Sequence, residues 1–101
     1  MANQVIYKKR FVNKLDKLLE YLEKEWPAKT ASHFLDNLDN TINAIKINPH
    51  IGIKTKLYNT RGILITKHNK LYYRVDKDKI VVLNMIDTRR NPQNNPFTKN
   101  K

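Results

Sequence analysis

Side chains that bind phosphate are concentrated in the second half of this chain of 101 residues. Residues 49–101 carry 12 basic and 3 acidic side chains, whereas residues 1–48 carry 8 basic and 6 acidic ones. The formal net charge is +11, so about +9 belongs to the second half and +2 to the first. A lysine-rich surface can serve solubility alone, but so uneven a distribution favours a polyanionic partner such as nucleic acid, the ribosome or an acidic protein.

Several of these cations flank the predicted strands closely enough to suggest phosphate chemistry. Arg61, Lys70, Arg74 and Arg90 could stabilise the negative charge that develops on phosphorus when RNA is cleaved without a metal. Such a reaction also needs a base for the 2′-hydroxyl and an acid for the leaving oxygen, and His68 is the candidate for either role.

A simpler interpretation of the same residues is structural. His68 is then an ordinary turn residue, Arg74 forms an ion pair with Asp87, and Tyr72 is a core aromatic whose hydroxyl lies at the rim. If the surface only binds a target, the contacts are expected from Lys67, Tyr72, Arg74, Asp87 and Arg89.

Other chemistries are excluded by composition. There is no cysteine, Ser32 is the only serine, and Gly52 and Gly62 are the only glycines, so a thiol nucleophile, a serine triad and a glycine-rich phosphate loop are ruled out. The three histidines lack metal-ligand spacing. We therefore expect neither a metal nor a small-molecule cofactor.

The elements that must position the cations follow from hydrophobic periodicity. An apolar stripe from Phe11 to Trp26 predicts one helix, and a second stripe from Ala31 to Ile45 predicts another that stops before Pro49. The break at Trp26-Pro27 makes the pair an antiparallel hairpin, with Trp26 expected to close the end of its core. Val5–Tyr7 is expected to be an edge strand.

Three apolar runs in the second half predict strands, at residues 63–66, 71–75 and 80–86. Their short polar connections require neighbouring strands to be antiparallel. The last run is apolar at nearly every position and is expected to be buried on both faces. The predicted fold class is α+β: an N-terminal strand and an antiparallel helical hairpin packed on a three-stranded antiparallel meander.

The chain is long enough for one domain, which we place at residues 1–92. Residues 93–101 are expected to be a polar C-terminal tail that is extended or disordered until bound. No apolar run approaches the length of a membrane span and no signal-peptide pattern is present, so the sequence predicts a cytoplasmic protein with no membrane partner.

Taken in order, four fragments resemble the RelE/ParE superfamily, the toxins of type II toxin–antitoxin modules. They are the helix-break-helix from Tyr21 to Gly52, the run 61–64 (RGIL), the run 67–75 (KHNKLYYRV) and the run 86–92 (IDTRRNP). The Glu-Trp break and the closing Asp-x-Arg-x-x-Pro are similar to the ParE branch, whose better-known members inhibit DNA gyrase. The RelE branch instead cuts messenger RNA on the ribosome with basic residues and a C-terminal tyrosine.

The resemblance implies a growth-inhibiting toxin that a cognate antitoxin neutralises, with gyrase as the favoured target. The alternative is a ribosome-dependent endoribonuclease, for which Arg61, Lys70, Arg90 and His68 are the implied catalytic groups. Pro96 and Phe97 stand where that branch has its tyrosine, so whether the chain is an enzyme stays open. A third hypothesis is a non-toxic basic protein that binds nucleic acid.

Overall fold

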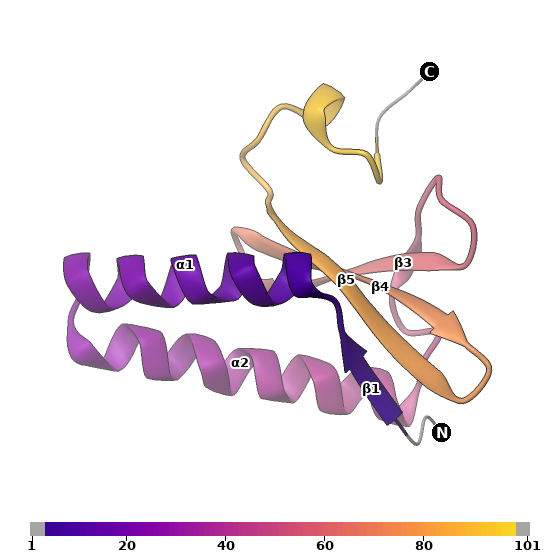
Figure 1. Cartoon of the computed structure of the whole chain (residues 1–101), viewed down its shortest axis with the longest axis horizontal. Helices are drawn as coiled ribbons and strands as arrows, with labels where there is room; N and C mark the ends of the chain where they lie inside the picture. The colour runs from indigo at the N-terminus through magenta and orange to yellow at the C-terminus, as the bar shows by residue number, and fades with distance from the viewer. Residues whose placement is uncertain (1–3, 99–101) are drawn as a thin grey trace.

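The computed structural model describes residues 4–98, which form two helices, five strands and one short 3-10 helix. Their bounds are β1 Gln4–Tyr7, α1 Lys9–Glu25, α2 Ala28–Ile47, β2 Ile53–Lys54, β3 Thr60–Thr66, β4 Asn69–Asp76, β5 Lys79–Asp87 and the 3-10 helix Pro92–Asn94. The predicted α+β class is confirmed, and β2 is a strand that the sequence did not reveal. Figure 1 shows α1 and α2 lying side by side and antiparallel.

The two helices begin and end close to where the apolar stripes predicted. Pro27 lies directly before α2, where its fixed φ suits a helix start, and Asn48 ends α2 before Pro49. The expectation for Trp26 was wrong, because its side chain is 53% exposed. Trp26 follows the last turn of α1 with extended backbone angles, so the helical period no longer directs it toward the core.

The strands form a single sheet in the order β1-β5-β4-β3-β2. The meander β3-β4-β5 is antiparallel, as its short turns require, whereas β1 pairs parallel with β5. The pairing of β4 with β5 shifts between Tyr72 and Tyr73, which leaves Leu83 as an extra residue in β5. The shift lets Ile80 and Val82 share one face with Met85 rather than with Asn84.

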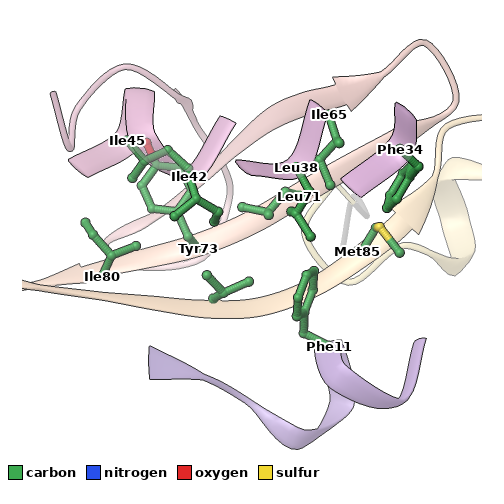
Figure 2. Packing of buried hydrophobic residues seen from close by; sticks show 11 residues of the cluster. Phe11, Phe34, Leu38, Ile42, Ile45, Ile65, Leu71, Tyr73, Ile80 and Met85 are labelled. Atoms are coloured by element: carbon green, nitrogen blue, oxygen red, sulfur yellow. The ribbon is translucent and has the colours of Figure 1, made fainter. Parts of the chain in front are cut away.

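Both helices pack on one face of this sheet. The core contains Phe11 from α1, a ladder of apolar residues from α2, and alternate residues of β3, β4 and β5. Figure 2 shows Phe11 reaching from α1 toward Leu71 and Met85, while Leu38 and Ile42 approach from α2. The labelled members are Phe11, Phe34, Leu38, Ile42, Ile45, Ile65, Leu71, Tyr73, Ile80 and Met85.

The other face, which we call the helix-free face, carries a second and smaller core. Tyr72 and Ile86 are buried there under Phe97, and Leu83 packs against them. β5 is therefore buried on both faces, as predicted. The free tail expected after residue 92 is not what the structure shows through residue 98, because Phe97 is only 6% exposed. Residues 99–101 of that expected tail lie outside the described residues.

None of the helices within residues 4–98 combines the length and apolarity needed to cross a bilayer.

Candidate functional site

Strand register assigns the candidate residues to different faces of the sheet. Residues directly opposite each other on paired strands point to the same face, and neighbours along a strand alternate. Gly62 lies opposite Tyr72 and Leu64 opposite Lys70, so Lys70 and Tyr72 belong to the helix-free face. Arg61 lies opposite Tyr73, a core residue, and so belongs to the face that the helices cover.

Lys70, Tyr72, Asp87 and Arg90 come together at one end of the helix-free face. They line an open hollow of about 240 Å³ that we call the basic hollow. Its lining residues are Lys70, Tyr72, Ile86, Asp87, Thr88, Arg90, Pro92, Asn95 and Thr98. Four of the residues singled out in the sequence therefore share one site, to which β4, β5 and the C-terminal segment each contribute.

Gly62 makes room for the side chains that border this hollow. A Cβ atom at Gly62 would lie 2.8 Å from Cε of Lys70 and 2.9 Å from Cε1 of Tyr72. The Lys70 Nζ lies 5.8 Å from the centre of the Tyr72 ring, within the range of a cation–π contact. The Lys70 side chain and the Tyr72 ring therefore lie together over the backbone of β3 at Gly62.

Arg61 is placed elsewhere, and its guanidinium has structural partners. Its Nη1 donates hydrogen bonds to the carbonyl oxygens of Gly52 (2.8 Å) and His50 (3.2 Å). The Tyr73 hydroxyl holds the same loop, since it accepts from the Gly52 N–H at 2.9 Å and donates to the Pro49 carbonyl at 2.8 Å. The structure does not bring Arg61 to Lys70 and Arg90.

Lys67 and His68 form the turn between β3 and β4, next to the end of β5. The backbone carbonyl of His68 accepts a hydrogen bond from the Thr88 N–H at 2.9 Å, and the Lys67 carbonyl accepts one from the Thr88 hydroxyl at 3.1 Å. His68 does not line the basic hollow. Arg74 shares the face of Tyr72 but lies toward the other end of β4, opposite Val81.

The carboxylate of Asp87 pairs with Arg89, not with Arg74 as the structural interpretation proposed. Nη2 of Arg89 lies 2.7 Å from Oδ2, and its Nε donates to Oδ1 at 3.0 Å. These hydrogen bonds from Arg89, with smaller help from the nearby His68, lower the pKa of Asp87 to about 2. The group therefore stays ionised at neutral pH and is unsuited to proton transfer there.

Cations of α1 beside the basic hollow were missed by the sequence analysis. Nζ of Lys14 donates to the Met85 carbonyl at 3.1 Å, and the pKa of Lys14 is lowered by burial and then by the charges of Arg90 and Arg10. Arg10 and Lys14 lie in the half of the chain with little net charge, so the charge distribution did not point to them. Their spacing of four residues, which puts them on one side of a helix, was the available signal.

Within residues 4–98, no three histidine, aspartate or glutamate side chains gather as a metal site would require.

One family model matches most of the chain. It describes the ParE toxin of the parDE type II toxin–antitoxin system and matches residues 5–92. No curated protein matches the sequence.

Solved structures of low sequence identity share the fold. The chromosomal ParDE TA system from P. aeruginosa matches with a TM-score of 0.70 at 12% identity, over 86% of this chain and 96% of that one. The YoeB/ParE toxin from Agrobacterium tumefaciens gives 0.61 at 14% identity, over 83% and 97%. The YoeB-YefM complex from Staphylococcus aureus gives 0.56 at 13% identity, over 85% and 95%.

Proposed function

Because the chain belongs to the ParE toxin family of type II toxin–antitoxin systems, within the RelE/ParE superfamily, we propose that it arrests bacterial growth by binding to DNA gyrase. The basic hollow and its surroundings are the proposed contact surface. Lys70 and Arg90 would make its central contacts above the buried ring of Tyr72, with Lys67 and Arg89 at its edge.

The observation that carries this proposal is the division of the candidate cations between the two faces of the sheet. Lys70 and Arg90 share the basic hollow, whereas Arg61 holds the loop at Gly52 on the other face. The one carboxylate among the residues lining the hollow, Asp87, has its pKa lowered to about 2 by Arg89. A hollow that joins two cations to a carboxylate held ionised by Arg89 supports binding better than proton-transfer catalysis.

The proposal is tested with purified protein in two parallel assays. We expect the toxin to inhibit supercoiling of relaxed plasmid by gyrase and to leave a cell-free translation reaction running at its normal rate. Loss of translation with intact supercoiling would overturn the proposal.

A second candidate function is a ribosome-dependent endoribonuclease. The observation that favours it is the presence of Lys70 and Arg90 in one hollow beside the hydroxyl of Tyr72. The hydroxyl accepts a hydrogen bond from Nδ2 of Asn95 at 3.2 Å, so a substrate would have to displace Asn95 to use it. The translation assay above distinguishes this function from gyrase inhibition.

We also propose a cognate antitoxin as a protein partner. Two of the similar structures are named as toxin–antitoxin assemblies, ParDE and YoeB-YefM. Two features of this chain offer docking surfaces. Tyr21, Trp26 and Leu35 leave exposed apolar area on the helical hairpin. Also, β2 pairs with only two residues of β3, so within the described residues no strand covers the outer edge of residues 63–66.

Co-expression with the neighbouring reading frame is expected to give a stable complex, because an acidic antitoxin segment would complement the basic second half of the chain. The measurement is co-purification on a tag placed on the antitoxin, followed by size-exclusion chromatography. A variant tests the docking position. Leu64 is 53% exposed on the open edge, and Leu64→Asp should weaken the complex if a strand of the antitoxin adds there. Recovery of two separate species would contradict the antitoxin proposal.

A further inference from the structure

A second hollow lies at the edge of the sheet formed by β2 and β3. It is lined by the loop that follows α2 and by the loop that joins β2 to β3, and its volume is about 300 Å³. We call it the loop hollow. Among residues 4–98, it shares no lining residue with the basic hollow, so it is a separate feature of the surface.

The loop hollow gathers positive charge that nothing nearby neutralises. Of the described residues that line it, none is acidic and four are basic: His50, Lys54, Lys56 and Arg61. Lys54 lies directly opposite Arg61 on the paired strand, so both cations point to the same face of the sheet. Like charges in this position destabilise a strand pair. Residues 40–75 contain neither aspartate nor glutamate. Local conflicts of this kind are typical of functional sites, and this one would be relieved by an anion.

The guanidinium of Arg61 is already fixed in position at this hollow. The hydrogen bonds that it donates within the described part of the chain come from Nη1, to the carbonyl oxygens of His50 and Gly52. The edge formed by Nε and Nη2 is therefore left for a ligand. That edge matches two oxygens of one phosphate group. A side chain held in place beforehand loses little conformational freedom when a ligand binds, which favours affinity.

The outer wall of the loop hollow is shaped by hydrogen bonds within the protein. In the loop between β2 and β3, the Thr55 N–H donates to the Thr60 carbonyl at 2.9 Å, and the Leu57 N–H donates to the Thr55 hydroxyl at 3.1 Å. The loop is attached to β4, because the Asn59 carbonyl accepts from the Val75 N–H at 3.3 Å. The hollow is therefore formed before any ligand arrives.

Apolar and aromatic side chains stand beside the cations. Leu57 and Tyr58 both line the loop hollow and are 44% and 87% exposed. A tyrosine ring offers a flat apolar surface with a polar hydroxyl at its end, which suits the sugar or base of a small ligand. The mixture of apolar surface and a few polar groups is typical of small-molecule sites, and about 300 Å³ is within their range of volumes.

We propose that the loop hollow binds a small molecule that carries a diphosphate group. Arg61 binds one phosphate through Nε and Nη2, and Lys54 and Lys56 bind the other. Leu57 and Tyr58 contact the rest of the ligand. Two lysines and one arginine match the charge of a diphosphate, whereas the single carboxylates of an acidic peptide would leave cations uncompensated. This site goes beyond gyrase binding and does not depend on it.

The test is isothermal titration calorimetry with pyrophosphate, ADP and adenosine, without divalent metal and in about 0.15 M salt, which screens non-specific attraction. We expect pyrophosphate and ADP to bind and adenosine not to bind. Tighter binding of ADP, lost in Tyr58→Ala, would identify a nucleoside diphosphate as the ligand. Equal binding would identify inorganic diphosphate.

A pair of double variants separates the site from net charge. Lys54→Ala/Lys56→Ala should weaken binding of pyrophosphate about tenfold, because both side chains are exposed and each loses a charged contact. Lys24→Ala/Lys29→Ala removes the same charge from exposed positions of the helical hairpin and should leave the affinity unchanged. Equal losses in the two variants would overturn the proposal, as would absence of binding at millimolar pyrophosphate and ADP.

A second measurement locates the ligand on the unmodified chain, so it does not require a variant to fold. Pyrophosphate should shift the NMR amide signals of residues 54–61, and shifts confined to Lys70 and Arg90 would contradict the proposal. A single-stranded oligonucleotide that displaces pyrophosphate from the loop hollow and binds there more tightly would also overturn it, in favour of a nucleic-acid surface. None of these assays contains gyrase, so a negative result leaves the gyrase proposal untouched.

Discussion

Phe11→Ala is expected to lower the free energy of unfolding by about 3–5 kcal/mol, the range for removing a fully buried phenylalanine. Phe11 is 1% exposed and is the one fully buried side chain of α1. Its ring packs between the helix and β5, and it stacks on Tyr7 with ring centres 5.8 Å apart. Because a domain of this size is stable by only about 5–15 kcal/mol, the loss would remove a large part of the total.

Urea unfolding followed by circular dichroism measures this change. The midpoint should fall while the dependence of free energy on urea stays the same. The neighbouring Val12 is 38% exposed, so Val12→Ala provides a control in the same helix that should shift the midpoint little. A Phe11→Ala variant as stable as Val12→Ala would mean that α1 does not dock on the sheet as described.

Removing both cations of the basic hollow, in Lys70→Ala/Arg90→Ala, is expected to weaken gyrase inhibition by about tenfold to a hundredfold. A hydrogen bond to a charged group contributes about 1.5–3 kcal/mol, and partial exposure of these side chains reduces that value. The readout is the toxin concentration that halves supercoiling. The stability should change little, since neither side chain belongs to a buried cluster.

The control for that variant is Lys24→Ala/Lys29→Ala, which removes the same charge from exposed positions near the far end of the helical hairpin. If both double variants weaken inhibition equally, net charge and not the basic hollow is responsible. Arg61→Ala is a poor substitute for either, because it also releases the carbonyls of His50 and Gly52.

Much of this fold could be predicted because the spacing of apolar residues along the chain reflects which face of each element is buried. The two helices, the three long strands and the edge strand at Val5–Tyr7 each follow from an apolar run whose spacing, length and flanking residues suit that element. Strand alternation places Leu71 and Tyr73 on one face of β4 and Tyr72 on the other, and the two separate cores contain these residues accordingly. The ordered fragments that resemble the RelE/ParE superfamily led to the family that the comparison then identified.

The remaining features depend on register, which local patterns do not encode. Arg61 and Lys70 were grouped because both border the predicted strands, and only the pairing of Arg61 with Tyr73 shows that they point to opposite faces. β2 has two residues and no pattern to detect. The segment after residue 91 has the polar, proline-rich composition of a tail, and a single phenylalanine decides that it packs.

The parallel pairing of β1 with β5 also sets the order in which the molecule is completed during synthesis. Gln4 pairs with Lys79, which lies 79 − 4 = 75 positions later in the chain. The first strand and helix therefore leave the ribosome long before the strand on which they must dock has been made. Closing so long a loop is slow and gains nothing until β5 is present. A nascent chain that ends before β5 cannot complete the core around Phe11, so the folded toxin forms only after β5 has been translated.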